Sequence, residues 1–149
     1  MSGNSKFVYV TYIRTTPEKL WEAFTKPELN RLYWFGAAQE SDFKKGSPWR
    51  IVFADGRVAD TGEVLESDPP RRLVLSWRNE LMPEMKAEGY ARATITMEPE
   101  GATVKLTVVH EMDRESSKFI GAVSNGWPKI LSGLKSLLET GAPLETAKS

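Results

Sequence analysis

Few residues of this 149-residue chain are of types that carry out chemistry, and the most notable is its single histidine, His110. His110 follows Val104, Leu106 and Val108 at a spacing of two, so it is expected on the inward face of a strand. A histidine there acts either as a general acid or base in a cavity or as a hydrogen-bonded core residue. No serine or acidic residue is evidently arranged with it, which favours the core role.

The carboxylates give a weak catalytic signal. Glu63 and Glu66 are close enough in sequence for paired acid–base chemistry. Glu63, however, lies on the face opposite Gly62 and Val64 in an alternating strand, which predicts a solvated side chain. The chain contains no cysteine, no Asp-rich calcium loop, no phosphate-binding glycine loop and no Gly-x-Ser-x-Gly sequence. We therefore expect no catalytic residue, no metal and no cofactor, and an enzyme is the less favoured class.

Aromatic residues give the stronger signal, because five tryptophans in a chain of this size indicate a thick core or an aromatic-lined cavity. Trp21 and Phe24 are expected in the core. Ligand pockets are lined by apolar and aromatic groups with a few polar ones, here His110, Tyr90 and Arg92. The candidate ligand-binding residues are Trp34, Trp49, Phe53, Trp77, Tyr90, His110, Val123, Trp127 and Leu131. The four tryptophans among them stay open between core and cavity wall.

The elements that must position these residues follow from apolar periodicity and turn signals. Strands are expected at 7–13, 49–53, 58–66, 73–77, 90–97 and 103–111, with two short helices beginning at Thr16-Pro17 and Lys26-Pro27. A long helix at 119–138 is capped by Ser116 or Ser117 and ends at Gly141. Pro128 either bends this helix or starts it. Residues 79–88 are interpreted as a mobile loop whose segment 81–85 could cover an open end.

This order of elements predicts an α+β fold in which a curved antiparallel sheet of six or seven strands wraps around the long C-terminal helix. A helix is about 10–12 Å wide, which is narrower than such a sheet. The space between them must therefore be filled by large side chains or by a ligand.

Three segments resemble a known family. They are residues 13–28 running into Tyr33-Trp34-Phe35-Gly36, residues 62–66 with 69–73 and Ser76-Trp77, and Gly126-Trp127-Pro128 leading into 131–139. Together they resemble the START-like (SRPBCC) superfamily with its helix-grip fold, most closely the family named after the activator of the heat-shock-protein-90 ATPase. The resemblance implies an internal cavity. It also implies a membership of small-hydrophobe carriers, cyclase-like enzymes and chaperone-associated proteins, so fold alone does not fix function.

Three hypotheses about function follow. The first is binding of a small hydrophobic molecule, lipid-like or aromatic, in the cavity. The second is a cyclase or hydrolase-like enzyme that uses His110 and cavity water. The third is an interaction protein that modulates a chaperone or regulator through its sheet face or the 81–85 loop. The co-chaperone that names the family has a separate N-terminal domain contacting its partner; this chain has no room for one, so an ATPase-activator role is not expected.

Composition sets the remaining expectations. Twenty basic and twenty acidic residues balance, and without a block of like charges we expect no nucleic-acid partner. No stretch approaches about 18 apolar residues, so no membrane span is expected. Without cysteine or an apolar run after residue 6, we expect a cytoplasmic protein without a secretory signal. We expect one domain over 1–149 with an ordered core of about 6–141 and polar tails, and neutral charge is compatible with a homodimer.

Overall fold

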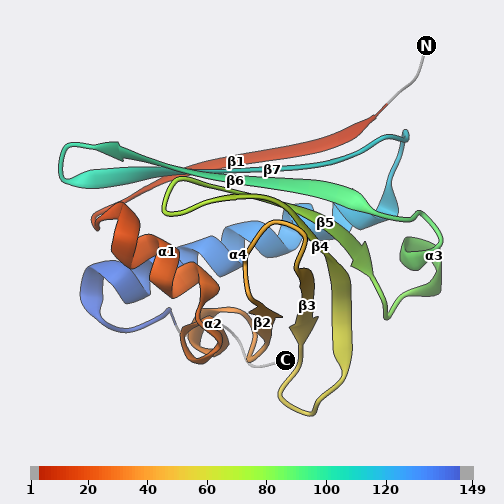
Figure 1. Ribbon diagram of the computed structural model, residues 1–149, viewed down its shortest axis with the longest axis horizontal. Coiled ribbons are helices and arrows are strands. Elements are labelled where there is room, and N and C mark those ends of the chain that lie inside the picture. The colour runs from red at the N-terminus through yellow and green to blue at the C-terminus, as the bar shows by residue number, and fades with distance from the viewer. Residues whose placement is uncertain (1–3, 145–149) are drawn as a thin grey trace.

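Seven antiparallel strands form the sheet in the computed structural model, which describes residues 4–144 (Figure 1). The strands are β1 (Ser5–Ile13), β2 (Ala38–Ser41), β3 (Pro48–Val52), β4 (Val58–Asp68), β5 (Arg72–Asn79), β6 (Ala91–Glu100) and β7 (Thr103–Met112). Their order across the sheet is β1-β7-β6-β5-β4-β3-β2. The predicted α+β fold with a broad antiparallel sheet is confirmed; the expected polar tails lie partly outside the described residues.

Alternation of side chains sets the two faces of the sheet, as the sequence predicts. On β7, Val104, Leu106, Val108 and His110 all point inward and are fully buried. β1 pairs with β7 along its whole length, from Ser5 opposite Met112 to Ile13 opposite Val104. One face is therefore dry, and it needs a covering layer.

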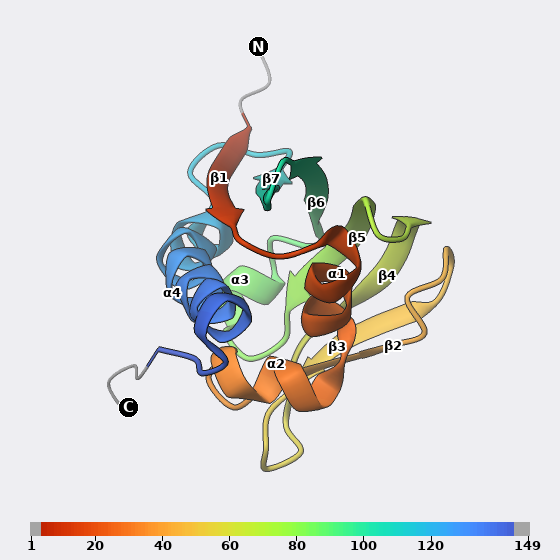
Figure 2. The ribbon, with the colours of Figure 1, turned by 90° about the vertical axis from the view of Figure 1, so that its left-hand side faces the viewer.

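The helices supply that layer. They are α1 (Pro17–Thr25), α2 (Pro27–Tyr33), α3 (Pro83–Lys86) and α4 (Lys118–Thr140). Figure 2 shows the sheet as an arc running from β1 to β2, with α4 on its concave side and α1 and α2 closing the remaining gap. This is the helix-grip arrangement that the order of elements predicts.

Both ends of α4 are set by the residues that the sequence indicates. The Ser117 hydroxyl accepts a hydrogen bond from the Ile120 N–H, which caps the first turn. Gly141 ends the helix in the left-handed region at φ 87°. Pro128 lies inside the helix, so the alternative in which the helix starts at Pro128 is wrong. The buried face of α4 consists of Phe119, Ile120, Trp127, Ile130, Leu131, Gly133 and Leu134.

Two elements differ from the sequence expectation. β2 was not expected, because Ala38–Ser41 contains no β-branched or aromatic residue, yet it pairs with β3 at the edge of the sheet. The segment 79–88, expected as an irregular loop, contains the short helix α3. Its carboxylates Glu80 and Glu88 anchor it: Glu80 accepts from Thr61 Oγ1 at 2.8 Å, and Glu88 accepts from the Lys118 N–H at 2.8 Å. A covering role for this segment stays a prediction.

Candidate functional site

A pocket of about 190 Å³ lies between α4 and the far part of the sheet. Trp34 reaches it from the end of α2, Ile51 from β3, Asp60 from β4, and Trp77 with Asn79 from β5. One face of α4 forms the remaining wall, through Phe119, Ala122, Val123, Gly126, Trp127 and Ile130. The pocket is thus bounded mainly by apolar and aromatic groups, with one ionisable side chain.

Four tryptophans fill most of the space that the sequence predicts between helix and sheet. The ring centroids of Trp49 and Trp77 are 4.4 Å apart, those of Trp34 and Trp127 5.5 Å, and those of Trp77 and Trp127 5.6 Å. Such tilted and edge-on contacts are the favoured geometry of aromatic pairs. Side chains therefore occupy most of the gap, and the pocket is what the tryptophan cluster leaves open.

Three of these tryptophans are held in place through their indole N–H groups. Trp49 Nε1 donates to Gln39 Oε1 at 2.8 Å, Trp77 Nε1 to Asp60 Oδ2 at 2.9 Å, and Trp127 Nε1 to His110 Nδ1 at 3.0 Å. Buried polar groups need partners, so each hydrogen bond fixes the orientation of one ring. Of the rings in the pocket wall, Trp77 and Trp127 are therefore positioned by polar contacts as well as by packing.

Gln39, which accepts the Trp49 hydrogen bond, also ties the short helices to the sheet. Gln39 Nε2 donates to the Phe24 carbonyl at 2.6 Å, and the Gln39 N–H donates to Asn30 Oδ1 at 2.9 Å. Asn30 Nδ2 also donates to the Phe24 carbonyl, at 2.9 Å. Because Asn30 and Gln39 are both fully buried, this network fixes the end of α2 from which Trp34 enters the pocket.

Asp60 is the polar residue of the pocket that sequence reasoning missed. Burial raises its pKa to about 6, the negative charge of Glu80 adds to the rise, and the Trp77 N–H acts in the opposite direction. A carboxyl in an apolar pocket with a pKa near neutrality is a feature of binding and catalytic sites. Oδ2 accepts the Trp77 hydrogen bond, and no described residue donates to Oδ1.

The signal for Asp60 was present in the strand pattern. Asp60, Gly62 and Val64 recur at a spacing of two in β4, and the same alternation that places Glu63 outside places Asp60 inside. The register agrees, since Asp60 pairs with Ile51 on β3, which is buried. The signal was therefore an acidic residue at a position that alternation assigns to the inner face of the strand.

His110 lies behind the pocket wall rather than in it. Its ring packs against Trp77, with centroids 4.9 Å apart, and against Phe119, at 5.2 Å. Burial lowers the pKa of His110 to about 3, so the imidazole is neutral at physiological pH. Because Nδ1 accepts the hydrogen bond from Trp127, Nε2 carries the hydrogen, and it has no partner among residues 4–144. With its acceptor nitrogen occupied, His110 fits the core role and not that of a general base.

The other predicted ligand-binding residues divide into three groups. Trp34, Trp77, Val123 and Trp127 line the pocket. Trp49 and Leu131 are buried in the core beside it.

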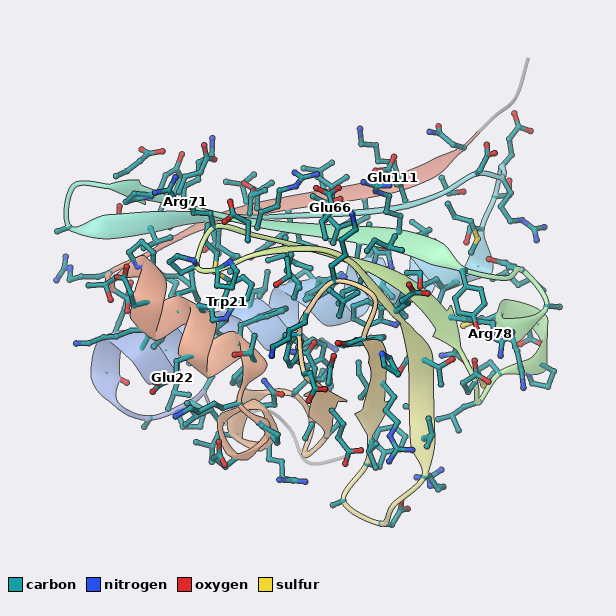
Figure 3. All side chains as sticks on the ribbon, viewed as in Figure 1. Trp21, Glu22, Glu66, Arg71, Arg78 and Glu111 are labelled. Atoms are coloured by element: carbon teal, nitrogen blue, oxygen red, sulfur yellow. The ribbon has the colours of Figure 1, made fainter. Side chains whose placement is uncertain are left out.

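Phe53 and Tyr90 lie elsewhere. β3 ends at Val52, and Phe53 belongs to the hairpin turn, where the Arg57 guanidinium carbon lies 4.9 Å from its ring centroid. Tyr90 is in phase with Arg92, so it lies on the outer face, 52% exposed. Its ring contacts the guanidinium of Arg78, which Figure 3 shows beside α3.

The paired-carboxylate hypothesis fails on geometry. Glu63 is exposed, as predicted. Glu66 lies on the convex face of the sheet, away from α4 (Figure 3). It forms ion pairs there with Arg72 at 3.4 Å and Arg92 at 3.2 Å. Neither carboxylate reaches the pocket.

Two further features are absent from the part of the chain that the structure describes. Within residues 4–144, no three His, Cys, Asp or Glu side chains gather in a way that could hold a metal ion. None of the helices there has the length and apolar character needed to cross a membrane.

Comparison with known proteins gives one family. The family model described as activator of Hsp90 ATPase homolog 1-like protein matches residues 14–139. No curated protein matches the sequence.

Solved structures share the fold. A protein from Mesorhizobium loti (MLL2253) is 25% identical with a TM-score of 0.76, covering 90% of this chain and 96% of its own. The Aha1 dimer of Colwellia psychrerythraea is 16% identical with a TM-score of 0.71, covering 92% and 98%. An HSP90 activator of Plasmodium falciparum is 20% identical with a TM-score of 0.72, covering 89% and 95%.

Proposed function

The chain belongs to the family of activator of Hsp90 ATPase homolog 1-like proteins, and from that premise we propose that it binds a small hydrophobic molecule in the pocket between α4 and the sheet. The observation that carries this proposal is an apolar pocket in which hydrogen bonds hold two of the aromatic wall residues, Trp77 and Trp127, in fixed orientations. A binding site needs such preorganisation, because ordering side chains on binding costs free energy.

The volume limits the ligand. Drug-sized ligands occupy pockets of roughly 300–1,000 Å³, whereas an engineered cavity of about 150 Å³ takes benzene. The pocket here, at about 190 Å³, is closer to the second case. The proposed ligand is therefore a molecule of one aromatic ring or a short alkyl chain, and a long-chain lipid is too large unless the wall moves.

Burial alone gives modest affinity for such a ligand. A ring that buries roughly 150–250 Å² gains about 4–6 kcal/mol from apolar burial, before the cost of immobilising the ligand. That range corresponds to dissociation constants of about 1 mM to 40 μM at best. A polar contact in the pocket is needed to add affinity and to select the ligand.

The test is a titration with toluene, followed by NMR through the indole N–H signals. Trp77 and Trp127 line the pocket, whereas Trp21 lies on α1 outside it and serves as an internal control. We expect toluene to shift the Trp77 and Trp127 signals saturably and to leave Trp21 unchanged. Palmitate, which is too large, should leave all three unchanged. If toluene at its solubility limit moves neither Trp77 nor Trp127, the proposal is wrong.

Self-association is a second candidate, favoured by the outer face of β1. Val8, Val10 and Tyr12 alternate along this edge strand and are 52%, 43% and 46% exposed. An exposed apolar edge strand is a template for pairing with another chain, and the Colwellia psychrerythraea relative was solved as a dimer. Light scattering on the chromatographed protein tests this: we expect a dimer that Val10→Lys dissociates. A monomer at all concentrations would remove this candidate.

A further inference from the structure

The carboxylate of Asp60 has no cationic partner in the pocket. None of the ion pairs formed by residues 4–144 includes Asp60. The basic groups of the neighbouring segment are occupied, since Arg78 and Lys86 both pair with Glu80, at 2.6 Å and 3.1 Å. Arg57, the basic residue nearest to Asp60 in sequence, pairs with Asp55 at 2.8 Å. Glu80 itself carries the same charge as Asp60 and disfavours its ionisation.

The other elements around the pocket supply no positive charge either. The face of α4 that lines it consists of Phe119, Ala122, Val123, Gly126, Trp127 and Ile130, all uncharged. β3 contributes Ile51 and α2 contributes Trp34. His110 of β7, behind Trp77, is neutral. Among residues 4–144, the Trp77 N–H is therefore the one group that donates a hydrogen bond to the Asp60 carboxylate.

We propose that the pocket takes a small organic ammonium ion, with its N–H groups on the free oxygen of Asp60 and its apolar part among Trp34, Trp77 and Trp127. This inference rests on the proposed function and names the class of molecule that fills the same pocket. Asp60 is half-buried, and a charge that is partly withdrawn from water is costly unless it is paired. An ammonium supplies the missing partner.

The walls favour the same ligand class. Aromatic rings attract cations through their electron-rich faces, most strongly tryptophan, and aromatic cages are the common solution for binding organic ammonium ions. The pocket combines three indole side chains and the Phe119 ring with one carboxylate. Its volume of about 190 Å³ fits an ammonium attached to one ring or to a short alkyl chain.

The charge of Asp60 makes binding of such a ligand depend on pH. The pKa of Asp60 is raised to about 6 by burial, so the carboxylate is ionised above that pH and neutral below it. An ammonium ligand should therefore bind more weakly as the pH falls through about 6. A neutral ligand of the same shape should not follow this trend.

The experiment compares three probes of nearly equal shape by calorimetry or NMR titration: benzylammonium, benzyl alcohol and toluene. We expect benzylammonium to bind roughly tenfold or more tightly than benzyl alcohol near neutral pH, because a charge-assisted hydrogen bond is stronger than a neutral one. Asp60→Asn should remove this preference and leave toluene binding in place. Glu63→Gln, which removes an exposed carboxylate of the same strand, is the matched control and should keep the preference.

The outcomes separate the two proposals. If toluene binds and benzylammonium binds no better than benzyl alcohol, the ammonium proposal is wrong and the apolar pocket stands. If the preference survives in Asp60→Asn, the ammonium does not bind through this carboxylate and the proposal is again wrong. If none of the three probes binds the wild-type protein, the proposed function fails together with it.

Discussion

The Asp60→Asn variant should be more stable than the wild-type protein, and increasingly so as the pH rises. Asparagine keeps the shape of the side chain and an oxygen that can accept the Trp77 hydrogen bond, but it carries no charge. The wild-type carboxyl has a pKa of about 6 in the folded protein, against 3.8 for an ordinary aspartate. Between these values the folded protein binds more protons than the unfolded chain, so its stability falls as the pH rises.

The size of the effect follows from the two pKa values. The difference between 3.8 and about 6, at about 1.4 kcal/mol per pH unit, corresponds to roughly 3 kcal/mol. The difference in unfolding free energy between Asp60→Asn and wild type should therefore be smallest below about pH 4, grow up to about pH 6 and stay constant above it. His110 and the other titrating groups are present in both proteins, so their contributions cancel in this difference.

Urea unfolding at a series of pH values measures the difference directly, provided that unfolding is two-state. Glu63→Gln is the control for loss of one negative charge from the same strand, and its difference from wild type should not show this rise. A flat difference for Asp60→Asn, or a wild type that is the more stable protein at about pH 8, would refute the account of Asp60 as a half-buried, unpaired carboxyl.

Substitutions at three further positions test the pocket and its supports. Gly126 lies on the pocket wall with open space where a Cβ would be. Gly126→Leu should therefore fill the pocket and abolish toluene binding in the NMR titration. Gly126→Ala should stabilise the helix by about 1 kcal/mol in urea unfolding. Gly62→Ala would place a Cβ 1.8 Å from the Ser76 carbonyl oxygen of the neighbouring strand; we expect a loss of at least about 3 kcal/mol, and near-wild-type stability would contradict the close approach. Glu88 accepts from the Ser117 hydroxyl at 2.6 Å and from two N–H groups at the start of α4, so Glu88→Gln should cost about 1 kcal/mol or less near neutral pH. These hydrogen bonds outweigh the effect of burial and lower the pKa of Glu88. The stabilisation by Glu88 is therefore present above pH 4.5, the ordinary pKa, and is lost as the pH falls through the lowered pKa. If Glu88→Gln still destabilised the protein in acid, the result would argue against the cap.

Local rules were sufficient to predict most elements of the fold. Strict alternation in β7 and the cap residues Ser117 and Gly141 of α4 are strong signals, because each depends on near neighbours in sequence. β2 depends instead on its partner: Ala38–Ser41 has weak strand propensity and is extended because β3 and the buried Gln39 hold it there.

The candidate site was predicted in part, for a similar reason. Trp34, Trp77, Val123 and Trp127 were candidate ligand-binding residues because apolar periodicity indicates which face of an element is buried, although it left the tryptophans open between core and cavity wall. Periodicity does not show where an element ends or which buried rings touch one another. Phe53 was therefore assigned to a strand that stops one residue earlier.

Two residues could have been assigned better from the sequence itself. Tyr90 lies on the same face of the strand pattern as the charged Arg92, and this alternation predicts that the Tyr90 side chain is exposed to solvent. Asp60 lies on the same face of its strand as Val64, and this alternation predicts that Asp60 points toward the inner face of the sheet, where it is half-buried at the pocket. The raised pKa of Asp60, by contrast, depends on Trp77 and Glu80, which come together only in the folded chain.

The most direct test of a small-molecule pocket is a crystal structure of the protein soaked with bromobenzene, recorded at a wavelength where bromine scatters anomalously. The pocket should hold a bromine peak in contact with Trp77 and Val123, without displacement of the tryptophan rings. Bromine peaks only at other places on the molecule, with the space between Trp77 and Val123 closed by side chains, would contradict it.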